Sequence, residues 1–416
     1  MDIFQSILGI LVFILFAWGI SENRSNFKLR TVLGGLSLQF LLAFLLIGNE
    51  FAEKIFSALN TFVSSLQKAT TEGAVMVFGY LGGGALPFNT EGSASTFILA
   101  FQALPLVLLM SALSAILYHW KVLPLLIKYL SLLLEKTTGV GGAVSIATAA
   151  NVFIGMVEAP LLVRPYISRM SRSEIFILMT SGMATISGTV LVLYAYLLES
   201  SMGSALGHIL TASLMSAPAA IMFALLMVPE GNEREIVSNY KFENQYSSTM
   251  DAIVQGTDAG LKLLLNIVAI LIVFVALVSL INMILAAFGS YLGITVKLQD
   301  LLGYAMAPVV WLTGIPWSEC LDAGKLIGIK TVLNEFLAYQ ELSLIGDELL
   351  CKRSKVIMTY SLCGFANFAS LGIVLAGLKS MAPNRKNEFI SLGFKSLISG
   401  TLSTLLTGSI ASLFII

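Results

Sequence analysis

Charged side chains are scarce in this chain of 416 residues, at 12% of the total, whereas soluble domains contain about 25%. Hydrophobic residues make up 57%, and the mean hydropathy is +0.88. The charges balance to a net of zero, so nothing indicates nucleic acid or an acidic partner. Most of the surface is therefore expected to face lipid.

Cysteine and histidine are also rare, with three and two residues respectively. The cysteines lack the spacing of metal ligands and are expected to be reduced, packed thiols. The glycine runs at 82–84 and 139–142 are not followed by the Lys-Ser/Thr pair that completes a phosphate-binding loop. The sequence therefore gives no sign of a structural metal or of nucleotide hydrolysis.

Long apolar runs predict eight membrane crossings, since about 20 apolar residues span a bilayer. They lie near residues 3–20, 32–48, 97–118, 174–198, 207–228, 261–288, 355–378 and 389–414. The first run follows Asp2 rather than a basic segment and has no cleavage pattern, so we interpret it as a retained helix and not a signal peptide.

Basic residues in the short loops predict the orientation. Arg24, Lys28 and Arg30 place the first loop in the cytoplasm, so both the N- and C-termini are expected outside the cytoplasm. The basic cluster formed by Lys352, Arg353 and Lys355 then falls outside, which departs from the rule.

Two apolar segments that are broken by glycine or a carboxylate predict re-entrant hairpins. Residues 137–163 lie between Lys136 and Arg164. If this segment enters and leaves the membrane on the cytoplasmic side, both basic flanks stay in the cytoplasm. A second hairpin is expected near 318–342, and each hairpin follows an interfacial helix, at 121–135 and 298–315. An odd number of crossings separates the hairpins, so the two repeats are inverted, as in many transporters.

Each hairpin carries a carboxylate at membrane depth, which marks a functional site by default. Glu158 and Glu335 are followed 21 and 23 residues later by a helix that begins Met-Thr. Small and hydroxyl residues interrupt both helices, at 181–190 and 363–372. Such residues allow close helix packing, but beside a carboxylate hairpin they favour unwound helices whose free carbonyls hold a cation.

The chain resembles the concentrative nucleoside transporter family over nearly its whole length. The resemblance is densest at Ala150–Tyr166, Gly182–Gly188, Asn334–Tyr339 and Gly364–Ser370, and the stretch 260–282 is similar to the family's long central helix. The resemblance implies an all-α polytopic membrane protein, a homotrimer of eight-crossing subunits, that moves nucleosides by an elevator mechanism coupled to sodium or protons.

The same resemblance assigns residues to the site. The ribose is expected at Glu335, Asn367 and Ser370, with Phe365 and Val190 as walls. Sodium, the favoured coupling ion, is expected at the side chains of Asn151 and Thr185 and the backbone carbonyls of Ile154 and Ile186. The resemblance also implies a scaffold and a transport domain, with 1–118 mainly scaffold, 119–228 the first transport repeat, 229–296 the connector and central helix, and 297–416 the second transport repeat.

The tip of the first hairpin departs from the family. The family typically has Gly-Gln-Thr-Glu there, with Gln and Thr bonded to the base, whereas this chain has Gly155, Met156, Val157 and Glu158. Two hydrogen-bonding side chains have become apolar, so the site loses discrimination on that edge of the base. Ile329, where the family often has Thr, is a milder departure. We expect ribose recognition to persist and the base preference to differ from the usual pyrimidine pattern.

Two alternatives stay open from the sequence. The carrier could move another polar metabolite, or Glu158 and Glu335 could be the carboxylate pair of an intramembrane enzyme. The enzyme is disfavoured because no nucleophile, metal-ligand set or nucleotide-binding loop accompanies the pair. The expected function is thus transport of nucleosides across a lipid bilayer, with no cofactor beyond the coupling ion, Na+ with H+ as the alternative, and no nucleic acid partner.

Overall fold

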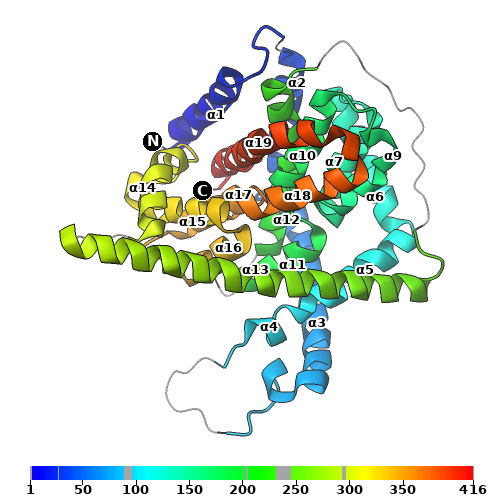
Figure 1. Ribbon diagram of the computed structural model, residues 1–416, viewed down its shortest axis with the longest axis vertical. Helices are drawn as coiled ribbons and strands as arrows, with labels where there is room; N and C mark the ends of the chain where they lie inside the picture. Colours follow the sequence, from blue (N-terminus) through cyan, green and yellow to red (C-terminus); the bar gives the residue numbers. More distant parts are fainter. Residues whose placement is uncertain are drawn as a thin grey trace.

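The computed structural model describes residues 2–26, 28–88, 96–199, 201–202, 205–230, 245–292 and 297–415. Within these ranges the chain is helical and contains no strand, which confirms the expected all-α class. Figure 1 shows a body of packed helices with one long helix, α13, along one side, and with α3 projecting away from that body.

The first part of the chain supplies long apolar helices and one amphipathic helix. They are α1 (Asp2–Gly19), α2 (Leu29–Leu46), α3 (Glu50–Phe78), the short α4 (Leu99–Gln102) and α5 (Pro105–His119), with the 3-10 turn Gly79–Gly82 after α3. Asn49 caps α3 by accepting a hydrogen bond from the Phe51 N–H. No element was predicted for residues 49–96, because α3 has one polar side and its apolar runs are too short to span a bilayer.

The first repeat follows the predicted order. The interfacial helix is α6 (Val122–Thr138), and the hairpin consists of α7 (Gly142–Ile154) and α8 (Glu158–Leu162), followed by α9 (Arg164–Ile167). The Met-Thr helix is divided into α10 (Arg172–Ala184) and α11 (Gly188–Leu198), and α12 (Ala205–Met227) follows. Ser171 and Glu174 form a capping box at the start of α10, which fixes where this helix begins.

The second repeat copies that order after α13 (Thr249–Leu292). Its elements are α14 (Leu298–Trp311), the hairpin of α15 (Cys320–Val332) and α16 (Glu335–Leu344), the divided helix of α17 (Lys352–Leu362) and α18 (Phe368–Met381), and α19 (Lys386–Ser412), with 3-10 turns at Trp317–Glu319 and Pro383–Arg385. Both predicted helix breaks are therefore present, at 185–187 and 363–367.

Six helical segments in the described residues are long and apolar enough to cross a membrane: Leu29–Leu46, Leu99–His119, Arg172–Leu198, Ala205–Met227, Thr249–Phe288 and Pro383–Ser412. The other two predicted crossings correspond to α1, which is a shorter apolar helix, and to α17 with α18, which the break divides. The central helix begins at Thr249, twelve residues before the predicted crossing at 261. The number of eight crossings stays a prediction.

Helices from both repeats form the core. α12 and α19 pack against each other, and both contact α10 and α17. α13 instead lies along α5 and leaves its apolar side uncovered, with Ile272, Val273 and Val275 each more than half exposed. The uncovered side of α13 is suited to lipid or to another subunit.

The two N-terminal helices also contact the repeats, since α1 packs on α19 and α2 on α12. In the loop between them Glu22 binds Arg172 at 2.8 Å and Lys395 at 2.7 Å. The hydrogen bond from Arg172, with help from Lys395, lowers the pKa of Glu22 to about 2. This ion pair ties the first loop to α10 and α19, while the division into scaffold and transport domains stays a prediction.

The basic cluster that departed from the orientation rule has structural partners. Lys355 is buried and binds Asp347 at 2.6 Å. Arg353 donates to the carbonyls of Gly314, Ser412 and Ile415 at 2.9–3.1 Å. Ser412 ends α19, so this guanidinium satisfies carbonyls that lack partners within the helix. Two of the three charges are thus occupied in holding the second repeat together.

The end of α10 touches the second helix break at Gly364. A Cβ atom at this position would lie 2.8 Å from the Ala184 carbonyl oxygen and 2.9 Å from that of Met183. Real side chains do not fit at such distances from backbone, so only glycine allows this approach. The end of α10 in the first repeat therefore rests directly on the break of the second repeat.

Candidate substrate and cation site

Glu335 is held at the start of the second arm of the second hairpin. Asn334 caps α16 by accepting a hydrogen bond from the Leu337 N–H at 2.9 Å. This cap makes Glu335 the first helical residue, where the helix dipole favours a negative charge. Its side chain is only 5% exposed, so a carboxylate is buried at the hairpin tip.

Residues from the second break surround this carboxylate. Asn367 donates from Nδ2 to the Glu335 Oε2 atom at 2.8 Å and accepts with Oδ1 from the Ser370 N–H at 2.7 Å. The second bond caps α18 and fixes the orientation of the amide. The structure therefore brings together the three residues expected at the ribose, Glu335, Asn367 and Ser370.

The remaining hydrogen-bonding capacity of this group suits a diol. The Glu335 carboxylate keeps free lone pairs, and Asn367 keeps one N–H. The Ser370 hydroxyl makes no hydrogen bond to any residue in the described part of the chain. The cluster can thus accept from two hydroxyl groups and donate to them at the same time.

Tyr194 is a member of this cluster that the sequence analysis missed. Its hydroxyl donates to the Glu335 Oε1 atom at 2.6 Å, and its side chain is 1% exposed. Its ring lies 4.8 Å from that of Tyr339, whose hydroxyl donates to the Thr359 carbonyl at 2.8 Å. An aromatic residue in an apolar run looks like ordinary lipid-facing or core sequence, so no local pattern distinguishes it.

Tyr194→Phe is expected to weaken nucleoside binding about tenfold. The change removes a hydrogen bond to a charged group, worth about 1.5–3 kcal/mol, and releases Glu335 on one side while preserving the ring. Isothermal titration with purified protein measures the change. Tyr196→Phe, on the same helix but half-buried, is the control, and equal affinities for the wild type and the Tyr194 variant would exclude an orienting role.

The two expected wall residues flank the breaks. Val190 lies in the first turn of α11 and is 5% exposed, and Phe365 lies within the second break and is 8% exposed. Both are apolar and nearly buried, as walls of a pocket require. Their contact with a ligand stays a prediction.

The tip of the first hairpin is a tight glycine turn. Gly155 has φ of +104°, and a Cβ there would lie 2.8 Å from the Glu158 Oε2 atom and 3.2 Å from the Ser187 side chain. The Glu158 carboxylate thus folds over Gly155. Unlike Glu335, Glu158 is exposed and has no side-chain hydrogen-bond partner in the described residues.

Met156 and Val157 point to different neighbours. The Met156 Cβ lies 3.3 Å from the position that a Cβ of Gly182 would take, next to the end of α10. The Val157 Cγ1 atom lies 3.8 Å from the position that a Cβ of Gly377, on α18, would take. Both are half-buried, so the tip presents an apolar face between the two divided helices.

The residues expected at the cation lie around the end of α10. Asn151 is in the last turn of α7, and its Nδ2 atom lies 3.6 Å from the Cβ position of Gly182, one turn before Thr185. Its Oδ1 atom is buried and has no hydrogen-bond partner in the described residues. Thr185 donates from Oγ1 to the Ser181 carbonyl at 2.9 Å, which leaves its lone pairs available.

The two carbonyls expected at the cation are at helix ends. Ile154 is the last residue of α7 and Ile186 lies in the first break, so neither has a partner from helix geometry. Ser213 on α12 approaches the Ile186 carbonyl at 3.4 Å. These neutral, hard oxygen donors, one of them an orphaned buried oxygen, fit an alkali cation.

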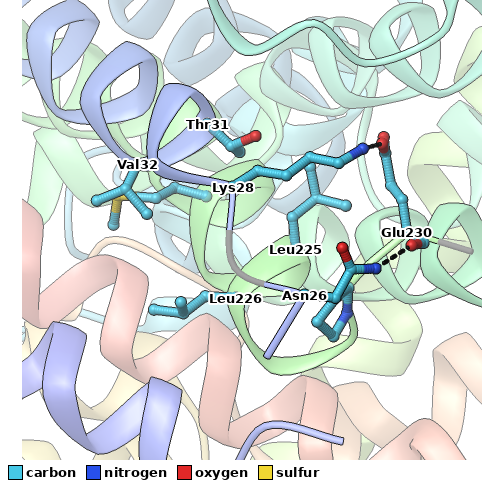
Figure 2. Close-up of a pocket in the computed structure, with 9 residues that line it drawn as sticks. Asn26, Lys28, Thr31, Val32, Leu225, Leu226 and Glu230 are labelled. Atoms are coloured by element: carbon cyan, nitrogen blue, oxygen red, sulfur yellow. Dashed lines mark hydrogen bonds and ion pairs between the residues drawn. The ribbon is translucent and has the colours of Figure 1, made fainter. Parts of the chain in front are cut away.

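A separate pocket lies between the start of α2 and the end of α12 (Figure 2). Lys28 binds Glu230 there at 2.5 Å, and Asn26 donates to the Glu230 carbonyl at 2.7 Å. The enclosed space is about that of a water molecule. This pocket is too small for a nucleoside and belongs to an ion pair that fixes the chain beside α2.

Three family models match the chain. Residues 8–81 match the Na+ dependent nucleoside transporter N-terminus, 208–412 match its C-terminus, and 100–201 match a model described as nucleoside recognition. Together they cover the helices that build the site.

Individual relatives match over almost the full length. The chain is 37% identical to the uncharacterized transporter YutK of Bacillus subtilis over all of both chains. It is 34% identical to the nucleoside permease NupC of Helicobacter pylori, with 99% of this chain and 97% of the relative covered. A solved structure of CNTnw in an inward-facing substrate-bound state matches with a TM-score of 0.87 and 34% identity, covering 100% of this chain and 98% of the other.

Proposed function

Because this chain belongs to the family of Na+ dependent nucleoside transporters, we propose that it binds the nucleoside's ribose at Glu335, Asn367 and Ser370 and its coupling sodium at Asn151 and Thr185. The chain is a membrane carrier and not an enzyme, since its relatives and structural neighbours are transporters. The observation that carries the proposal is the buried Glu335 carboxylate, which Tyr194 and Asn367 hold in place.

Ribose binding follows from the free hydrogen-bonding positions of this cluster. The two sugar hydroxyls would donate to Glu335, and Asn367 with Ser370 would donate to the hydroxyl oxygens. Bonds to an ionised group are about twice as strong as neutral ones. A substrate without a diol would leave these buried groups unpaired, so the cluster favours substrates that carry a diol, as the ribose of a nucleoside does.

The base would lie against the tip of the first hairpin. Met156 is adaptable and polarizable, and Val157 has no hydrogen-bonding group, so only Glu158 offers a polar side chain to the base. We therefore expect weak discrimination on this edge of the base, and a preference that differs from the pyrimidine pattern typical of the family.

Sodium coupling rests on the unpartnered Asn151 oxygen. A buried amide oxygen without a hydrogen bond costs about 1–3 kcal/mol, and a cation held there would remove that cost. Uptake into proteoliposomes is therefore expected to require an inward sodium gradient and to survive a protonophore. Uptake that persists without sodium and stops with the protonophore would instead favour protons, with Glu158 as their carrier.

One variant tests the proposed sodium site without changing the ribose site. Asn151→Leu is expected to raise the sodium concentration for half-maximal uptake at least about tenfold, the effect of losing about 1.4 kcal/mol of binding. Ser145→Ala is the matched control, because Ser145 is buried on the same helix and bonds only locally, to the Val140 carbonyl. An unchanged sodium response in the Asn151 variant would place the cation elsewhere.

The assembly and topology complete the proposal. The uncovered apolar side of α13 supports a homotrimer with this helix near its axis, and the two hairpin repeats support an elevator movement of the transport domain. We place the protein in the bacterial inner membrane with both termini outside. Uptake of a panel of nucleosides and unrelated polar metabolites distinguishes the nucleoside carrier from the alternative cargo.

A further inference from the structure

Lys330 is a fully buried charge that the proposed function does not use. It lies in the last turn of α15, in the first arm of the second hairpin, with 0% of its surface exposed. Its ammonium donates to the Ser361 carbonyl and to the Thr404 hydroxyl, each at 2.9 Å. Neither partner is charged, so this buried cation has no direct ion pair in the described residues.

The two acceptors place the ammonium at the second helix break. Ser361 lies in the last turn of α17, where carbonyls lack partners within the helix and the dipole favours a positive charge. Thr404 comes from α19, and its methyl group lies close to Gly364. Lys330 thus links the hairpin, the break and α19 at one point.

The first repeat places its cation site in the same arrangement. Asn151 lies in the last turn of α7, the first arm of its hairpin, and faces the last turn of α10. There the donor set is neutral and the Asn151 oxygen lacks a partner. In the second repeat, the corresponding position in the first arm is occupied by the positively charged side chain of Lys330.

Glu335, also buried, is a carboxylate that acts on this ammonium. The two groups interact electrostatically across the hairpin tip, with Lys330 at the end of α15 and Glu335 at the start of α16. Two opposite charges this far from water stabilise each other, whereas one alone is costly. The ammonium can therefore keep the carboxylate ionised for a sugar to bind.

We infer that the Lys330 ammonium is the fixed cation of the second repeat: it occupies the place that sodium takes in the first, anchors the hairpin to the end of α17 and compensates the charge of Glu335. Lys330 is thus a positioning residue for nucleoside binding. The inference rests on the proposed roles of Glu335 and of the sodium site at Asn151, although the charge compensation itself can be tested without substrate.

A double-mutant cycle tests the compensation. The melting temperatures of the wild type, Lys330→Met, Glu335→Gln and the double variant are measured without nucleoside. Each single change leaves one buried charge alone and should lower Tm, while the double variant should recover at least half of the summed loss. Strictly additive losses would overturn the inference, because independent structural roles give no recovery.

Ligand binding supplies the second test. At saturating sodium Lys330→Met should weaken nucleoside binding at least about tenfold, while the rise in Tm on adding sodium alone should match that of the wild type. Lys325→Met, on the same helix but partly exposed and paired with Asp322 and Asp300, is the control and should bind normally. Wild-type affinity in the Lys330 variant, or loss of its sodium response, would contradict the inference.

The two proposals fail in different ways. If Glu335→Gln keeps wild-type nucleoside affinity, the proposed ribose site is wrong, but recovery of Tm in the double variant would still support the charge pair. If Glu335→Gln abolishes binding and the losses in Tm are additive, the ribose site stands and the role of Lys330 is wrong.

Discussion

Glu335→Gln is expected to lower nucleoside affinity by about a hundredfold or more. The change replaces a charged acceptor with an amide, one end of which donates. Asn367 and Tyr194 both donate to the carboxylate oxygens, so the new NH2 group would face a donor wherever it points. The two ribose hydroxyls would also lose their bonds to an ionised acceptor. Two such bonds contribute about 3 kcal/mol or more to binding, which corresponds to a change in affinity of about a hundredfold.

Isothermal titration in saturating sodium measures this loss. Glu341→Gln is the matched control, since Glu341 lies on the same helix with an exposed side chain. The sodium-induced rise in melting temperature reports whether the variant retains the proposed sodium site of the first repeat. A Glu335 variant that binds like the wild type would remove this residue from the ribose site.

Met156→Gln combined with Val157→Thr is expected to shift the base preference toward pyrimidine nucleosides by about tenfold or more. Each restored hydrogen bond to a base edge contributes about 0.5–1.5 kcal/mol, and 1.4 kcal/mol is one decade. Because the Met156 and Val157 side chains approach different helices, α10 and α18, the two single changes should contribute separately.

Competition by nucleosides, free bases and deoxyribonucleosides measures both halves of this expectation. The wild type should discriminate strongly on the ribose hydroxyls, for which we propose the Glu335 cluster, and weakly on the base edge. Strong uridine selectivity in the wild type that the double substitution leaves unchanged would show that the first hairpin does not read the base.

Apolar runs in the sequence, and the residues that interrupt them, predicted the helices and hairpins that build the site. Apolar runs broken by glycine and a carboxylate led to both hairpins, and clustered small residues led to both helix breaks. These signals are local, because a charge at membrane depth is expensive wherever it occurs. The positions of Asn367 and Ser370 beside Glu335 could be expected only through the resemblance to the family.

The contact of Tyr194 with Glu335 and the contacts of Lys330 with its two acceptors could not be predicted from the sequence. Tyr194 meets Glu335 across 141 positions of the chain, and Lys330 meets Thr404 across 74. Such contacts depend on how α11 and α19 pack against the second hairpin, which no spacing encodes. The amphipathic α3 was missed for a different reason, since a search for apolar runs passes over a helix with one polar side.

The contact at Gly364 bears on how tightly sodium transport and nucleoside transport are coupled. The Met183 and Ala184 carbonyls belong to the turn that precedes Thr185 and Ile186, where we propose the cation, and they lie against the loop that leads to Asn367, where we propose the ribose. An ion that stiffens the first break would then stiffen the ribose partner through this backbone contact, and by linkage the nucleoside would tighten ion binding equally. Gly364→Ala would push the end of α10 away from the second break, and the expected result is uncoupled transport: sodium without nucleoside, and nucleoside without sodium.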